Sequence, residues 1–253
     1  PGQFEVNLRH ADPLQAADWL VATKDAVRAV AREDGIIASF MPKPSETMGG
    51  CGNHVHLSLW DRAGAGVTEG DGDGHPSGLS ATGRAFLAGI LAHARALVGL
   101  GAPTVNSYKR LQPGTWAPAH AAYAVGNRSS LVRIPGGARR RIEFRASDNT
   151  NNPYLFLAGL LAAGLDGLGR DLPLGDPAQG DLGHMDPAEV QRLGVAVLPR
   201  TAGEALAAVE ADPVVMAALG PVVGPEWLRV KRNELAAYDT VVGQWERDAY
   251  LRG

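Results

Sequence analysis

Three short segments of the chain alternate apolar and functional residues with the two-residue period of a β-strand: residues 4–9, 54–59 and 142–145. Because successive strand side chains point to opposite faces, each segment gathers its polar groups on one face. The residues that share a face are Glu5, Asn7 and Arg9, then His54, His56 and Ser58, and finally Glu143 and Arg145. Such a surface is costly to build unless divalent metal and phosphate occupy it.

The composition is that of an ordinary globular protein. A length of 253 residues with 45% hydrophobic residues supports one large domain or two small ones. A formal net charge of −3 argues against a nucleic-acid or anionic-membrane partner, while the arginines at 139–141 suit a small anion. The single cysteine, Cys51, excludes an intramolecular disulfide. With no membrane-spanning run and no leader sequence, a cytoplasmic location is expected.

The pattern along the chain predicts an α+β fold with an antiparallel sheet, covered by helices on one face and open and polar on the other. Helical spacing predicts helices over residues 12–34, 79–100, 153–168 and 225–251. Residues 36–41 and 129–134 add two strands to the three already described.

The histidines and glutamates each have an ordinary alternative explanation. His54 and His56 on one strand face are as often polar surface as metal or nucleotide contacts, and an isolated strand glutamate is usually solvated or salt-bridged. Glycines 49, 50 and 52 permit close approach of a ligand, although a tight turn explains them equally well. Taken together, a mixed Glu/His site fits Mg²⁺ or Mn²⁺ bridged to substrate phosphates. Cys51 is better explained as a small packing residue than as a nucleophile.

The arginines are the stronger indication, because Arg133 and Arg145 lie in strands whose neighbours are apolar. Guanidinium forks in such places suit carboxylate and phosphoryl oxygens. The chain has neither a P-loop nor a Rossmann fingerprint, so a nucleotide would be bound in another way. The arginines considered for this role are Arg110, Arg128, Arg133, Arg141 and Arg145.

Five sequence blocks, in order and spacing, resemble the catalytic domain of glutamine synthetases. They are residues 1–6 (PGQFEV), 50–59 (GCGNHVHLSL), 106–114 (NSYKRLQPG), 127–135 (NRSSLVRIP) and 141–154 (RIEFRASDNTNNPY). The resemblance covers nearly the whole chain and implies a single catalytic domain over residues 1–253, with a curved antiparallel sheet and an open catalytic face.

The resemblance also implies a role for each matching residue. Glu5, His54 and Glu143 match metal ligands, and Gly50, Arg110 and Arg145 match glutamate-binding positions. The ATP positions that match are His10, His56, Ser58, Arg128, Arg133 and Arg141, with Arg110, Arg128 and Arg133 expected to act in catalysis. The implied cofactor is Mg²⁺ or Mn²⁺, with ATP as co-substrate.

The implied chemistry has two steps. The γ-carboxylate of glutamate attacks the terminal phosphate of ATP, and an amine then displaces phosphate from the γ-glutamyl phosphate. Positioning and charge neutralisation carry such a reaction, so metals and arginines suffice without a covalent nucleophile.

The match departs from the family at the acceptor site. Trp116 stands where ammonia-using members carry a glutamate that helps to deprotonate ammonium. An indole cannot accept that proton, but it can form an apolar or cation–π surface against a larger amine. The resemblance therefore favours the branch that makes γ-glutamyl amides of polyamines or other primary amines, with ammonia as the alternative. A non-catalytic or regulatory relative remains a third possibility, against which the retained Glu5, His54 and Glu143 argue.

Two further features concern the rest of the protein. The loop at residues 180–184 lacks the tyrosine that some bacterial members have adenylylated. Family members also carry an N-terminal β-grasp domain and further metal-ligating glutamates before the point where this chain begins, and they assemble into ring-shaped homo-oligomers. This chain alone is therefore expected to be a weak catalyst.

Overall fold

A four-stranded sheet forms the centre of the computed structural model, which describes residues 2–70, 72–114, 117–137, 140–180, 186–192 and 194–252. The strand order is β1-β4-β3-β2. The strands are β1 (Val55–Leu57), β2 (Tyr123–Val125), β3 (Val132–Ile134) and β4 (Ile142–Phe144). The expected α+β class is confirmed.

The register of the sheet separates an apolar face from a charged one. Val55 pairs with Phe144 and Leu57 with Ile142, so these side chains share the face that packs on the helices. Glu143 lies opposite His56 on one side and Arg133 on the other, and these three side chains share the second face. The two-residue period of the sequence thus places apolar side chains on the buried face of the sheet and charged side chains on the other face.

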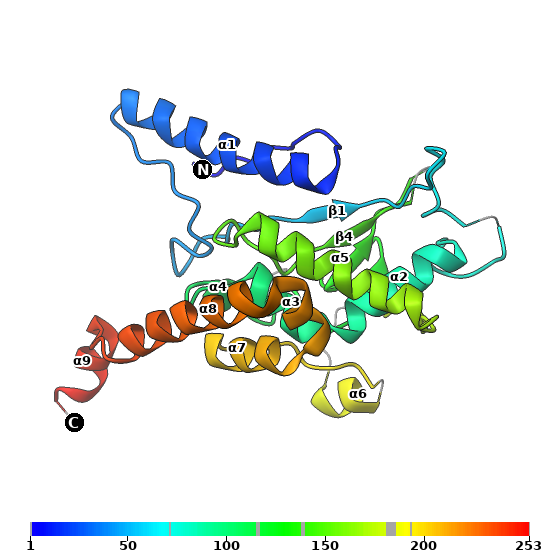
Figure 1. The fold of residues 1–253 in the computed structure, drawn as a ribbon. Helices are drawn as coiled ribbons and strands as arrows, with labels where there is room; N and C mark the ends of the chain where they lie inside the picture. The colour runs from blue at the N-terminus through cyan, green and yellow to red at the C-terminus, as the bar shows by residue number, and fades with distance from the viewer. Residues whose placement is uncertain are drawn as a thin grey trace.

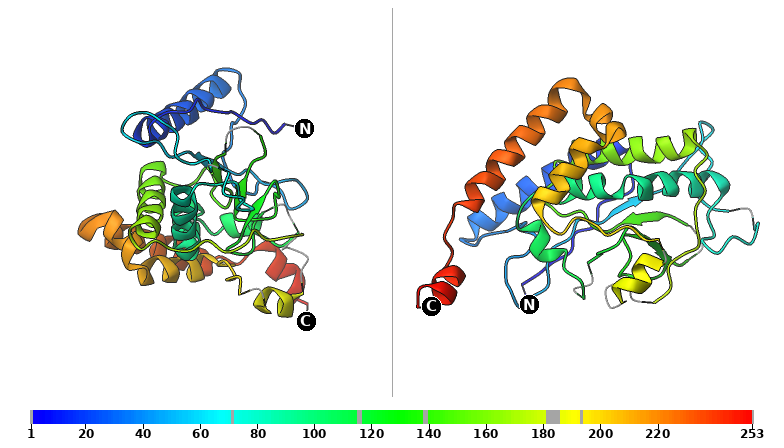
Figure 2. Two further views of the ribbon diagram at one scale, coloured as in Figure 1. Left: turned by 90° about the vertical axis from the view of Figure 1, so that its right-hand side faces the viewer. Right: turned by 90° about the horizontal axis from the view of Figure 1, so that it is seen from below.

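The described part of the chain also forms nine helices (Figure 1). The helices are α1 (Pro13–Glu33), α2 (Ala81–Ala92), α3 (Ala94–Gly101), α4 (Ser107–Arg110), α5 (Pro153–Gly169), α6 (Pro187–Arg192), α7 (Ala202–Ala211), α8 (Pro213–Asp239) and α9 (Gln244–Tyr250). Helices α2 and α5 lie side by side along the sheet, whereas α1 stands apart and α9 ends far from the sheet (Figures 1 and 2).

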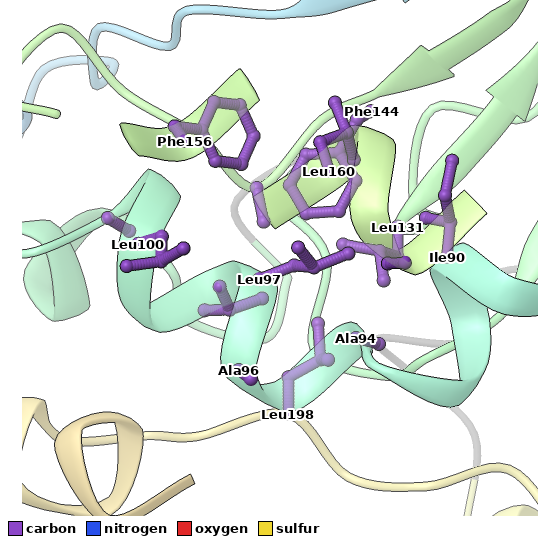
Figure 3. Packing of buried hydrophobic residues seen from close by; sticks show 14 of the residues in the cluster. Ile90, Ala94, Ala96, Leu97, Leu100, Leu131, Phe144, Phe156, Leu160 and Leu198 are labelled. Atoms are coloured by element: carbon purple, nitrogen blue, oxygen red, sulfur yellow. The ribbon is translucent and has the colours of Figure 1, made fainter. Parts of the chain in front are cut away.

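The main hydrophobic core fills the space between the sheet and helices α2, α3 and α5. Phe144 of β4 packs with its ring centroid 5.4 Å from that of Phe156 on α5. Leu97 of α3 and Leu160 of α5 are fully buried in the same cluster (Figure 3). Burial of such side chains stabilises the fold by about 1.5–3 kcal/mol each.

Local sequence signals set the ends of the core helices. Ser80 caps α2 by accepting a hydrogen bond from the Gly83 amide, and Asn152 caps α5 ahead of its first-turn proline, Pro153. The single helix predicted for 79–100 is instead two, because the chain bends by 74° at His93. No single described helix has the length and apolarity to cross a bilayer, although the bent pairs α2–α3 and α7–α8 do by length and composition alone.

Several strand and helix predictions are wrong. Residues 4–9 and 36–41 form no strand, because no described segment pairs with their backbones, and Phe4 and Ile37 are at least 90% exposed. The strand β2 was missed, and it pairs parallel to β3, so the sheet is antiparallel at two of its three pairings. The last helix begins earlier, at Pro213, and is kinked at Gly220, with α9 separate.

Helices α2 and α5 cross at two glycines, and we expect this crossing to tolerate no side chain. A Cβ on Gly89 would lie 2.1 Å from the Ala163 carbonyl oxygen, and one on Gly167 would lie 2.2 Å from that of Ala85. Gly89→Ala should therefore lower the free energy of unfolding by about 1–3 kcal/mol in urea denaturation. The control Gly169→Ala meets no atom within 4 Å. Equal stability of the two variants would contradict the close crossing.

Candidate active site

The charged face of the sheet is centred on Glu143, a carboxylate that is only 2% exposed. Its Oε2 lies 2.6 Å from Arg133 Nη1 and its Oε1 lies 2.7 Å from Arg145 Nη1. The cross-strand register places Arg133 directly beside it on β3. A buried carboxylate persists only with such partners, because its desolvation costs several kcal/mol.

Two imidazoles from β1 and the residues before it flank this carboxylate. His54 Nδ1 lies 3.4 Å from Glu143 Oε1, and His56 is the cross-strand partner of Glu143. Arg141 Nε lies 3.0 Å from His56 Nδ1 in hydrogen-bond geometry. Both histidines, both carboxylate oxygens and three arginines thus meet on one face.

The surroundings of the histidines favour their neutral forms. Burial, reinforced by the charge of Arg145, lowers the pKa of His54 to about 4. Burial also lowers the pKa of His56, against the opposing effect of Glu143. A neutral imidazole is the form that ligates a metal ion, so His54 is ready for that role at neutral pH.

The arginines differ in burial and in the protein groups that they contact. Arg145 Nε donates to the Arg128 carbonyl at 3.1 Å, in addition to its contact with Glu143. Arg110 is 6% exposed and donates to the carbonyls of residues 145, 146 and 147 at 2.9–3.1 Å. Its side chain also packs on Gly50, where a Cβ would lie 2.8 Å from Arg110 Cγ. The side chains of Arg128 and Arg141 are exposed.

The N-terminal segment follows this face through side-chain contacts. Gln3 Nε2 donates to the Gly50 carbonyl at 3.0 Å, and His10 Nε2 lies 3.3 Å from Ser58 Oγ. Trp60, which sequence reasoning missed, donates to Ser58 Oγ at 2.9 Å and stacks obliquely 5.9 Å from His10. An exposed aromatic directly after the 54–59 pattern was the signal that could have identified it.

A divalent metal fits part of this arrangement. His54 and Glu143 place a nitrogen and an oxygen donor side by side. Glu5 lies on the exposed segment before α1, and no group of three or more His, Cys, Asp or Glu side chains among the described residues is spaced to hold a metal. The three predicted ligands therefore do not form one complete shell, and their metal role stays a prediction. Trp116, the predicted acceptor wall, lies outside the described residues.

Comparison with known proteins agrees with the resemblance. The family model for the glutamine synthetase catalytic domain matches residues 1–250. The chain is 42% identical to a glutamine synthetase of Halobacterium salinarum and 42% identical to a glutamate–methylamine ligase of Methyloversatilis universalis, over 99% of its length in each case. A solved GmaS–ADP complex superposes with a TM-score of 0.87 at 38% identity, covering 98% of this chain and 56% of that chain.

The chain therefore belongs to the glutamine synthetase family, whose catalytic domain it matches. It spans 55% of the Halobacterium relative and 57% of the methylamine ligase.

The lowered pKa of His54 predicts a measurable effect of pH on stability. Between its folded pKa of about 4 and the unfolded value of 6.5, the unfolded chain binds more protons, so stability rises with pH across this window. Because the His54 side chain is 37% exposed, we expect screening to limit the contribution to about 1 kcal/mol. The free energy of unfolding should be measured in urea with a chelator present. When the pH is lowered from 6.5 to 4.5, it should fall more for the wild-type protein than for His54→Gln. Parallel profiles would contradict the assignment.

Proposed function

We propose that this chain is the catalytic portion of an ATP-dependent ligase that joins the γ-carboxylate of glutamate to an amine. The observation that carries the proposal is one face of the sheet on which Arg133 and Arg145 pair with Glu143, His54 lies beside that carboxylate, and Arg141 contacts His56. Guanidinium forks bind phosphoryl and carboxylate oxygens, which are the groups that this reaction brings together.

The reaction begins when a γ-carboxylate oxygen of glutamate attacks the γ-phosphorus of ATP and ADP leaves. Arg128, Arg133 and Arg141 would neutralise the phosphoryl oxygens, while Arg145 and the Gly50 loop would orient glutamate. When bound at His54 and Glu143, Mg²⁺ or Mn²⁺ would supply further positive charge to these oxygens. The amine nitrogen then attacks the acyl carbon, phosphate leaves, and the nitrogen loses a proton.

Arg110 takes a different part in this proposal. Because its guanidinium donates to three consecutive carbonyls after β4, it braces the strand end beside Arg145. Its contact with Gly50 links that strand end to the proposed glutamate loop. Arg110 would thus act in substrate binding chiefly by holding the groups that touch glutamate.

The whole protein is proposed to be larger and oligomeric. The relatives are nearly twice as long as the matched region, and residues preceding it would include a β-grasp domain and further acidic metal ligands. Ring-shaped homo-oligomers would let that domain complete a neighbouring subunit's site. A cytoplasmic location fits the use of ATP and glutamate and the single cysteine.

The proposed acceptor is a primary amine or polyamine, with ammonia as the alternative. Overall similarity does not separate these, because identity is 42% to both the Halobacterium glutamine synthetase and the methylamine ligase. Trp116 supports the larger amine, since its indole offers an apolar wall and no proton acceptor.

The ligase proposal is tested by phosphate release from ATP and glutamate with the full-length protein, Mg²⁺ or Mn²⁺, and a panel of ammonium, methylamine and longer primary amines. We expect turnover that requires glutamate, ATP and one of these acceptors. A folded, metal-loaded protein with no turnover on any amine would contradict the proposal and favour the non-catalytic relative.

Replacement of the acceptor-site tryptophan should shift the preference between amines. Trp116→Glu introduces a proton acceptor and removes the apolar wall, so we expect kcat/KM for the preferred primary amine to fall about tenfold or more and the ratio of ammonium to amine use to rise. The control is Trp245→Phe, at an exposed position on α9. An unchanged ratio in Trp116→Glu, or ammonium as the best acceptor of the wild-type protein, would remove the role assigned to Trp116.

A further inference from the structure

Helix α1 is attached to the rest of the molecule by few apolar contacts. Only Ala17 and Ala31 of its residues are buried, whereas Leu14 and Val30 are at least 60% exposed. Figure 1 shows α1 standing away from the other helices. Burial of two alanines contributes little hydrophobic stabilisation, so polar contacts add to the half-buried Trp19 and Leu20 in holding this helix in place.

Lys24 provides one of these contacts from the inner side of α1. Its half-buried ammonium donates to the Asn149 carbonyl at 2.5 Å, in the turn that follows β4. Burial and the charge of Arg28 lower the pKa of Lys24, and the carboxylates of Asp148 and Asp25 oppose this shift. Asp148, whose charge acts on this ammonium, is fully buried.

The same ammonium also contacts the segment that leaves α1. Lys24 Nζ lies 5.8 Å above the centre of the Phe40 ring, and Arg28 lies 5.0 Å from it. Cation–π contacts of this kind contribute about 0.5–1 kcal/mol at partly exposed sites. Lys24 on α1 thus contacts two other segments: the extended segment around Phe40, which follows α1, and the turn after β4.

The segments around Asn149 and Phe40, the two partners of Lys24, both contact the Gly50–Gly52 loop, which is the proposed glutamate loop. Asp148 forms an isolated antiparallel bridge with Gly52, and Asn149 Nδ2 donates to the Gly52 carbonyl at 3.4 Å. The segment after Phe40 reaches the same loop, because the Cys51 amide donates to the Pro42 carbonyl at 2.8 Å. A Cβ on Gly52 would lie 2.8 Å from His54 Nε2, so this loop also abuts the candidate metal site.

The segment before α1 meets the loop from the other side. Gln3 donates to the Gly50 carbonyl and to Cys51 Sγ. A second polar contact, from the Tyr154 hydroxyl to Asp18 Oδ1 at 2.7 Å, holds the first half of α1 against α5. The position of residues 3–10, which include Glu5 and His10, therefore depends on where α1 is held.

We infer that Lys24 is a positioning residue, which holds α1 against the turn after β4 and so sets the placement of Glu5 and His10 relative to the Gly50–Gly52 loop. Lys24 touches no group proposed to react, and it acts through Asn149 and Phe40. The inference rests on the proposed function for its catalytic consequence, but its structural consequence is independent of activity.

The direct test is hydrogen exchange of the full-length protein measured by mass spectrometry. Lys24→Met removes the charge and keeps an apolar chain of similar length, so amides in residues 3–12 and 148–152 should exchange about tenfold faster. Arg32→Met is the matched control, because Arg32 is exposed on the same helix and loses the same charge. Exchange in Lys24→Met equal to that in wild type and in Arg32→Met would overturn the inference.

Kinetics provide the second readout. We expect Lys24→Met to raise the KM for metal-bound ATP about tenfold with kcat changed less than about threefold, and Lys24→Arg to recover most of this loss. If Lys24→Met does not accumulate as folded protein, Phe40→Leu removes the cation–π contacts of Lys24 and Arg28, leaves the Lys24–Asn149 hydrogen bond in place, and should show the same exchange pattern to a smaller extent. Faster exchange without any ligase activity would support the positioning role and refute the proposed function. Unchanged exchange with unchanged KM in an active enzyme would refute the positioning role.

Discussion

The buried charge of Glu143 is the interaction on which the functional face depends. Its two oxygens bind Arg133 and Arg145, and His54 lies within 3.4 Å. Removal of one member of such a buried network leaves the others without compensation, at a cost of about 3–5 kcal/mol. This network joins side chains of β3, β4 and the residue before β1, and so keeps guanidinium and imidazole groups together. In a ligand complex, metal and phosphate would take over part of this charge compensation.

The central strands and core helices could be predicted because local sequence and burial agree there. In β4, Ile142 and Phe144 are fully buried while Glu143 faces the opposite side, as the two-residue period requires. Helices α1 and α5 lie within two residues of their predicted bounds, since Gly35 and Pro153 mark their ends. The family blocks also include Arg133 and Arg145, which the structure pairs with Glu143.

The remaining features depend on contacts that no local pattern encodes. Residues 4–9 have strand periodicity, but without a paired backbone they are held by Gln3 and His10 side chains instead. The parallel pairing of β2 with β3 and the 74° bend at His93 arise from tertiary packing. The sequence does not show that Arg110 is buried or that it donates to three consecutive carbonyls after β4, because these contacts join segments distant in the chain. Lys24 gave no signal, because its partners are a carbonyl and a ring distant in sequence.

Metal and nucleotide binding on this face can be seen directly in an anomalous difference map at the manganese edge, from crystals of the full-length protein with Mn²⁺ and a non-hydrolysable ATP analogue. We expect a manganese peak next to the side chains of His54 and Glu143, and a phosphate of the analogue next to the Arg133 guanidinium. Manganese bound only elsewhere, with Glu143 still paired to both arginines and the analogue distant from Arg133, would contradict this expectation.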